Sequence, residues 1–196
     1  IRDRVYVPTG SASIAVYGLL PAATILGDSV AEFSNIQGQN NWYYGYYATP
    51  AQPSSFTQMT AFLNWRAWAE SPTQPPWTFV SAQYQHPRGT NEPGGLEHWS
   101  VRRFVSPKAG TLLLQGTLKK ADTTPNPKST GIYGHIFHNG QEVYVQYIGP
   151  VDGVGVNYSV TVPGVAVGDT IDFVVAPNGF SGSDSTAFTD TITWQP

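Results

Sequence analysis

Residues 132–148, IYGHIFHNGQEVYVQYI, carry the clearest indication of the fold. On both sides of Asn139-Gly140 the residues alternate between apolar and polar, and such alternation indicates half-buried β-strands. Asn-Gly is the strongest short signal for a two-residue β-turn. The stretch therefore predicts an antiparallel hairpin with strands Ile132–His138 and Gln141–Ile148.

A two-residue turn also predicts which side chains of this hairpin share a face. On one face we expect the pairs Phe137 with Glu142, His135 with Tyr144, and Tyr133 with Gln146. On the opposite face we expect Ile132, Ile136, Val143, Val145 and Tyr147, which would be the core face. Rings stack on the apolar side of a pyranose and polar groups bond its hydroxyls, so the first face suits a sugar-binding platform. The alternative is that a second sheet or a loop covers this face and its polar groups satisfy one another.

The same alternation continues through the second half of the chain. Further strands are predicted at Trp99–Val105, Thr111–Leu118, Val156–Val162, Thr170–Ala176 and Phe188–Trp194. The first half is less regular, with strand patterns near Ile14–Tyr17 and Asn40–Tyr47. We expect an all-β, antiparallel β-sandwich, jelly-roll-like, with little helix, at most a short one between Ser55 and Ala69.

One sandwich domain is predicted over residues 1–196, with residues 1–30 as a candidate N-terminal arm or edge strand. The stretch from Thr49 to Pro93 is long, irregular and rich in Pro, Trp and Gln. Long irregular segments in compact domains are usually functional.

Composition narrows the function classes. Charged residues make up 12% of the chain and aromatic residues 13%, whereas ordinary domains carry about 25% charge. The net charge is −3 and no basic stripe is visible, so a nucleic-acid partner is not predicted. No apolar run approaches the roughly 20 residues of a membrane-spanning helix. Cysteine is absent, which excludes disulfides. Low charge with many aromatic and amide side chains is typical of a secreted, extracellular or cell-surface protein that meets neutral polar partners.

Four residues outside the hairpin are further candidates for ligand binding. Trp42 and Tyr44 would share one face of the strand Asn40–Tyr47, although large aromatic residues are more often part of a sandwich core. His86 is a candidate for the rim of the site. Arg102 and its neighbour Arg103 would point to opposite faces of their strand. One of them is expected to be half-buried against a carboxylate of Asp172, Asp184 or Glu142, or to clasp vicinal hydroxyls or a uronate carboxylate.

Catalysis is not predicted. No pair of carboxylates stands at a spacing diagnostic of a glycosidase, and no Gly-x-Ser-x-Gly elbow is present. His135 and His138 would lie on opposite faces of a strand, which makes them a poor metal pair. No cofactor is expected, although oxygen ligands near Asp184 or Asp190 would suit a structural calcium ion.

Several segments, in order along the chain, resemble the sequence pattern of a known domain family. They are residues 33–47 (Phe33-Ser34-x-x-Gln37-Gly38-Gln39 onward to Tyr47), His86-Pro87, residues 99–103, residues 134–137, residues 168–173 and residues 184–188. Together they resemble a carbohydrate-binding-module-like β-sandwich domain of secreted bacterial surface and polysaccharide-active proteins. The resemblance implies a carbohydrate-binding-like fold and no catalytic residue. Residues 1–30 lie outside it, and Phe104 stands where the pattern has Trp.

Two function classes follow from these observations. The first is a non-catalytic module that binds a polysaccharide or other glycan. The second is a structural or assembly subunit of a surface filament, layer or capsid, in which Val5, Val7, Ile14 and Val16 would add a strand to a neighbour and cause self-association. A hydrolase or lyase is a weaker third interpretation.

Overall fold

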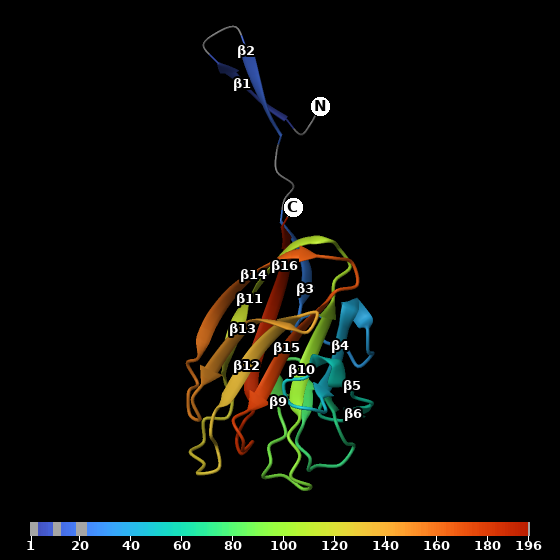
Figure 1. Cartoon of the computed structure of the whole chain (residues 1–196), viewed down its shortest axis with the longest axis vertical. Coiled ribbons are helices and arrows are strands. Elements are labelled where there is room, and N and C mark those ends of the chain that lie inside the picture. Colours follow the sequence, from blue (N-terminus) through green and yellow to red (C-terminus); the bar gives the residue numbers. More distant parts are fainter. Residues whose placement is uncertain (1–3, 10–12, 19–22, 196) are drawn as a thin grey trace.

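The computed structural model describes residues 4–9, 13–18 and 23–195, and it shows two antiparallel sheets packed against each other (Figure 1). The first sheet has the order β13 (Gln141–Ile148), β12 (Ile132–His138), β15 (Thr170–Pro177), β10 (Trp99–Val105), β4 (Trp42–Tyr47) and β5 (Phe56–Gln58). The second has the order β14 (Val156–Val165), β11 (Gly110–Lys120), β16 (Thr186–Gln195), β9 (Tyr84–His86), β8 (Phe79–Ser81), β7 (Ala67–Ala69) and β6 (Ala61–Leu63), with β3 (Thr24–Asp28) also paired to β16. The prediction of an all-β sandwich is confirmed.

The main core lies between the two sheets, because alternate residues of each strand point inward. In the first sheet the rings of Trp42 and Phe104 lie 5.0 Å apart. Phe173 meets Phe188 of the second sheet edge to face, with 5.8 Å between ring centroids. All four side chains are fully buried, and burying such a side chain stabilises the fold by about 2–3 kcal/mol. Gly134 allows the sheets to approach, since a Cβ there would lie 2.3 Å from Cδ2 of Leu118.

The N-terminal strands form a sheet of their own. β1 (Arg4–Thr9) pairs with β2 (Ser13–Gly18), and among the described residues neither pairs with another strand. β3, also inside the predicted arm of residues 1–30, belongs to the second sheet. Residues 1–3, 10–12, 19–22 and 196 lie outside the described part of the chain. The assignment of one domain to residues 1–196 stays a prediction.

The prediction of little helix is confirmed, and the stretch between Ser55 and Ala69, where at most a short helix was expected, contains no α-helix. This stretch forms the short strands β5, β6 and β7, and the helical residues of the described ranges are two 3₁₀ turns, Gln39–Asn41 and Pro53–Ser55. A short apolar run fits either period, and here strand pairing with β4 and β8 decides the conformation. Within residues 4–9, 13–18 and 23–195, no helix has the length and apolar character that a bilayer span requires.

The predicted hairpin turn is present, but the pairing beyond it is shifted by one residue. Asn139 and Gly140 have φ of 48° and 82°, as a two-residue hairpin turn with two left-handed residues requires. Phe137 pairs with Glu142 as predicted, but Ile136 pairs with Tyr144 because Val143 is an extra residue in a β-bulge. A one-residue shift moves every following side chain to the other face.

Candidate functional site

The bulge changes which residues accompany Tyr133 and His135. His135 pairs with Val145 and Tyr133 pairs with Tyr147, rather than with Tyr144 and Gln146. Val145 and Tyr147, expected in the core, are 47% and 41% exposed.

Tyr144 and Gln146 were predicted to lie on the same face as Tyr133 and His135, and this prediction is wrong. Tyr144 pairs with Ile136, Gln146 pairs with Gly134, and both lie on the side of β13 that faces the second sheet. The Tyr144 ring packs against the main core and lies 5.4 Å from the ring of Tyr158. This packing favours the bulged register, because it covers apolar surface of Tyr144 that the regular register would expose.

The outer face of the first sheet carries a row of rings that we call the aromatic face: Trp99, Tyr133, His135, Phe137 and Tyr147. The indole of Trp99 stacks on the imidazole of His135, with centroids 4.8 Å apart and 13° between planes. Tyr133 lies 6.1 Å from His135 and 5.2 Å from Tyr147. Tyr133 is 37% exposed, so this face is open to solvent at the Tyr133 and Tyr147 end.

Hydrogen bonds hold the rings of the aromatic face in place. Nε1 of Trp99 donates to Oε1 of Glu97 at 2.7 Å, and Nδ1 of His135 lies 2.8 Å from Oε2 of Glu142. Burial lowers the pKa of His135 and outweighs the opposing effect of Glu142, so the imidazole is neutral near pH 7. With Nδ1–H donating to Glu142, Nε2 is left as an acceptor for a ligand hydroxyl.

The opposite end of the same sheet face is closed. Nε and Nη2 of Arg103 bind the two carboxylate oxygens of Asp172, both at 2.7 Å, and the Tyr47 hydroxyl donates to Oδ2 of Asp172 at 2.6 Å. The Phe56 ring lies 3.8 Å from the Arg103 guanidinium carbon, and Gly45 makes room for it, since a Cβ there would lie 2.6 Å from Phe56. Of the three carboxylates considered as arginine partners, Asp172, Asp184 and Glu142, Asp172 is the one that binds Arg103.

Arg102 does not join the aromatic face, contrary to the prediction. Its side chain is fully buried between the sheets. Nη1 donates to the Phe188 carbonyl at 2.6 Å and lies 3.4 Å from Oδ2 of Asp190, while Nη2 donates to the carbonyls of Ser81 and Ala82. Successive side chains of a β-strand point to opposite faces of the sheet, so Arg102 of β10 points inward and Arg103 points outward.

Trp42 and Tyr44 are also fully buried in the main core, as the alternative interpretation expected. Nε1 of Trp42 donates to Oε2 of Glu32 at 2.9 Å. Both rings are inaccessible from the surface, so neither can stack on a sugar.

His86 lies in the second sheet, away from His135. It lines a cavity of about 470 Å³ together with Trp77, Glu92 and Asp122. Its Nδ1 lies 2.7 Å from the Pro87 carbonyl oxygen, and burial lowers its pKa to about 4. The nine predicted residues thus separate into three at the aromatic face (Tyr133, His135, Glu142), three in the core, two on the inner side of β13, and His86.

The carboxyl groups of Asp184 and Asp190, suggested above as calcium ligands, are each paired with a basic side chain of the protein. Nζ of Lys120 lies 2.5 Å from Oδ1 of Asp184, and Arg102 accompanies Asp190. Among the residues that the structure describes, no group of three or more His, Cys, Asp or Glu is arranged to hold a metal ion.

Sequence reasoning missed Trp99 and Tyr147 as members of the aromatic face. Trp99 starts a predicted strand, but its position next to His135 depends on β15 lying between β10 and β12. Tyr147 was assigned to the core because the bulge at Val143 has no glycine or proline to announce it.

Comparisons with known proteins add similarity of fold only. No family model matches the chain, and no curated protein matches it. Among solved structures, the chain is similar to the CBM51-2 and INT domains of ZmpB from Clostridium perfringens in complex with GlcNAc, at 6% identity and a TM-score of 0.40 over 97% of this chain. A second structure of these domains gives 8% identity and a TM-score of 0.40. The chain spans 36% of the length of either Clostridium chain.

The K3 cleaved adhesin domain of Lys-gingipain from Porphyromonas gingivalis is similar at 12% identity and a TM-score of 0.41, over 88% of this chain and 100% of that domain. Similarities this distant carry no argument about function.

Proposed function

We propose that this chain is a non-catalytic, extracellular domain that binds a polysaccharide or other glycan through the aromatic face. The observation that carries the proposal is the row of rings at Trp99, His135, Tyr133 and Tyr147, which is open to solvent at its Tyr133 and Tyr147 end. These rings come from three strands of one sheet, so the scaffold holds them rigidly. A rigid aromatic surface loses little conformational entropy when a sugar ring stacks on it.

The polar groups beside the rings suit hydroxyl recognition. The Tyr133 hydroxyl has no hydrogen-bond partner among residues 23–195, and Nε2 of His135 is an acceptor. The nearby carboxylates are engaged: Glu97 accepts from Trp99, Glu142 from His135, and Asp172 from Arg103. Carboxylates held in this way support binding better than acid–base catalysis, which needs a proton donor and a base facing the reacting bond.

The test is a pair of alanine variants. Tyr133→Ala removes a ring that is 37% exposed on the aromatic face, and Trp77→Ala removes a ring that is 48% exposed at the cavity beside His86. We expect Tyr133→Ala to weaken binding to the polysaccharide by about tenfold, the effect of losing roughly 1.4 kcal/mol, while Trp77→Ala binds as the unmodified chain does. Pull-down on insoluble polysaccharides and a glycan array would find the ligand, and calorimetry would compare the variants.

Equal affinity of the Tyr133→Ala variant and the unmodified chain would remove the aromatic face from the proposal. Both variants should unfold within a few degrees of the unmodified chain, because neither ring is part of the main core.

The second candidate function is that of an assembly subunit. The observation in its favour is the β1–β2 sheet, which pairs with neither sheet of the sandwich in the described residues. A two-stranded hairpin alone is marginally stable in water, and pairing with a neighbouring molecule would stabilise it. The size of the particle in solution separates the two functions: a monomer at micromolar concentration supports the glycan module, and fibres or rings support assembly.

A further inference from the structure

A groove lies beside the turn between β6 and β7, on the second sheet. Two cavities of about 450 and 490 Å³ adjoin there and share Ala31, Phe33 and Arg66 in their linings. We call this the Arg66 groove. The groove is formed by the irregular stretch between Thr49 and Pro93 and by the segment that follows β3. The aromatic face belongs to the other sheet.

Aromatic rings line the Arg66 groove at both ends. At one end Phe33 and Phe62 are stacked with centroids 6.3 Å apart and 30° between planes. At the other end lie Trp65 and Tyr84, which are 46% and 41% exposed. The Trp65 ring meets Phe79 edge to face at 4.9 Å, so its orientation is set before any ligand arrives.

Arg66 occupies a backbone position that favours glycine. Leu63 pairs with Ala67, which leaves a three-residue turn closed by a hydrogen bond from the Arg66 amide to the Leu63 carbonyl at 2.9 Å. Arg66 has φ of 63°, the left-handed conformation that ends such turns and that glycine adopts without strain. A strained residue in this position suggests that its side chain has a use.

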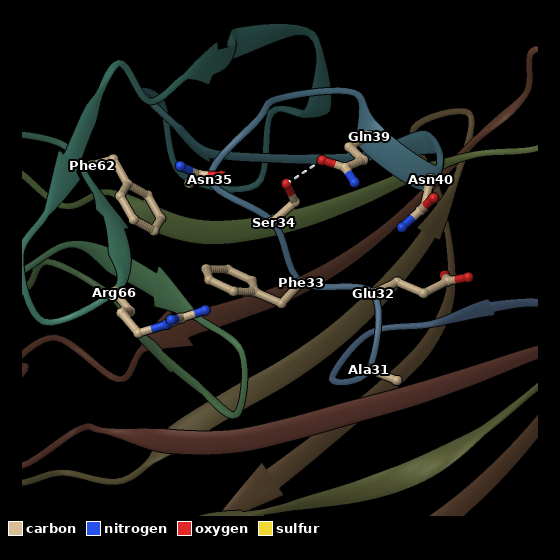
Figure 2. A pocket seen from close by; sticks show the side chains of 9 residues that line it. All are labelled: Ala31, Glu32, Phe33, Ser34, Asn35, Gln39, Asn40, Phe62 and Arg66. Atoms are coloured by element: carbon tan, nitrogen blue, oxygen red, sulfur yellow. Dashed lines mark hydrogen bonds between the residues drawn. The ribbon is translucent and has the colours of Figure 1, made fainter.

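The guanidinium of Arg66 is unengaged. Among the residues that the structure describes, it has no hydrogen-bond or ion-pair partner, and Figure 2 shows it directed toward the Phe33 ring. The side-chain amides of Asn35 and Asn40, which line the same cavity, likewise have no partner in the described ranges. Glu32 adds a carboxylate to the lining of this cavity; its Oε2 accepts hydrogen bonds from Nε1 of Trp42 and from the Asp28 amide, and Figure 2 shows it directed away from Arg66. Within the described residues, the groove therefore offers the unpaired guanidinium of Arg66 and two unpaired amides between aromatic rings.

We propose that the Arg66 groove binds an acidic saccharide, with the carboxylate of a uronic acid held by Arg66. A guanidinium binds a planar carboxylate through two parallel hydrogen bonds. The rings at the two ends of the groove stack on sugars before and after the uronate, and the amides of Asn35 and Asn40 bond hydroxyls. This site does not depend on the aromatic face, and it adds a charged ligand class that the neutral outer face does not call for.

Calorimetry with matched saccharides tests the proposal. The probes are short oligomers of galacturonate, of mannuronate and guluronate, and of a glucuronate-containing chain, each compared with the same oligomer after its carboxyl groups have been reduced to alcohols. We expect at least one acidic oligomer to bind. Its reduced form should bind about tenfold more weakly, because it loses the charge that strengthens its hydrogen bonds to the guanidinium. Added salt should weaken the binding of the acidic form.

Two variants and one control assign this binding to Arg66. Arg66→Gln removes the charge, and Arg66→Gly removes the side chain while relaxing the left-handed backbone. Lys128→Gln makes the same change of charge at an exposed position outside the groove. Both Arg66 variants should lose about tenfold in affinity for the acidic oligomer, and Lys128→Gln should lose none. Arg66→Gly should melt at the same or a higher temperature, so its loss of binding is not a loss of folding.

The proposal is overturned by any of three results: no acidic oligomer binds, acidic and reduced oligomers bind equally, or the Arg66 variants bind as the unmodified chain does. Preference for a sulfated neutral oligomer over every uronate would overturn the carboxylate assignment. Tyr133→Ala should leave uronate binding unchanged, and Arg66→Gly should leave binding at the aromatic face unchanged. The two sites can therefore fail separately.

Discussion

At the scale of single residues, burial sets the ionisation of several side chains. Burial lowers the pKa of His86 to about 4, and it raises the pKa of Asp190 to about 7 although Arg102 opposes the rise. Burial also raises the pKa of Asp184 to about 6 against the effect of Lys120. These shifts give stability opposite pH dependences. The folded chain holds fewer protons than the unfolded chain at His86, so acidification destabilises the fold there; it holds more at Asp184 and Asp190, so acidification stabilises the fold there.

The pH dependence of stability should contain a distinct contribution from His86. The usual pKa of 6.5 applies to the unfolded chain, so between pH 6.5 and pH 4 the unfolded chain binds the extra proton. The stabilisation of the fold by a neutral His86 is thus fully present above pH 6.5, and it is lost as the pH falls toward 4. From a shift of about 2.5, the loss at pH 5 is roughly 2 kcal/mol.

Asp184 and Asp190 titrate in the same window with the opposite sign, so His86 has to be isolated by comparison. Urea unfolding of the unmodified chain and of a His86→Gln variant at pH 7 and pH 5 does this. The unmodified chain should lose about 2 kcal/mol more than the variant on acidification. An identical pH dependence of the two proteins would show that the buried imidazole is not the cause.

At the scale of the element, the bulge in β13 determines the composition of the aromatic face. It places Val145 and Tyr147 outside beside His135 and Tyr133, and it turns Tyr144 toward Tyr158. Without the extra Val143, Glu142 and Tyr144 would be consecutive and would still oppose Phe137 and Ile136. The residue that makes the bulge is therefore the one residue of β13 whose removal preserves the pairing on both sides of it.

Deleting Val143 should consequently be tolerated. We expect the unfolding free energy to change by less than about 1 kcal/mol, because Val143 is 37% exposed and surface changes are usually small. Deleting Tyr144 should instead cost about 2 kcal/mol, since Val143 would take its place and the ring would be lost from the core. Urea unfolding gives both values, and amide NMR spectra check the pairing. The prediction is wrong if the Val143 deletion is the more damaging of the two.

At the scale of the whole molecule, the two sheets are joined by an apolar core that contains buried ion pairs. Arg102 and Lys120 are fully buried and meet Asp190 and Asp184, and breaking such a pair leaves an uncompensated charge. The β1–β2 sheet takes no part in this core among the described residues. The sandwich and the hairpin are therefore expected to contribute separately to stability.

Removing residues 1–22 should leave the unfolding free energy of the sandwich unchanged within about 0.5 kcal/mol, as for changes remote from the core. It should also leave the molecular mass in solution that of a monomer. Chemical denaturation and light scattering of the full and shortened chains test both points. Conversion of an oligomer into a monomer by this deletion would instead identify the chain as an assembly subunit.

Local sequence signals were sufficient to predict several strands and one turn. Alternation and turn residues predict β10, β12 and β13 with the bounds they have, and Asn139-Gly140 predicts its turn. The same alternation correctly joined Tyr133, His135 and Glu142 on one face. Local signals were enough there because the period of two and the left-handed turn are properties of a few neighbouring residues.

How these elements combine depends on contacts between distant parts of the chain. The tertiary structure placed Trp99 against His135 across β15, turned Tyr144 and Gln146 inward through the bulge, buried Arg102 between the sheets, and opened the groove at Arg66. Each outcome depends on partners far apart in the chain: Arg102 is set by carbonyls of Ser81 and Phe188. Strand order and register are chosen by the free energy of burying side chains from many strands at once, and no window of neighbouring residues contains that sum.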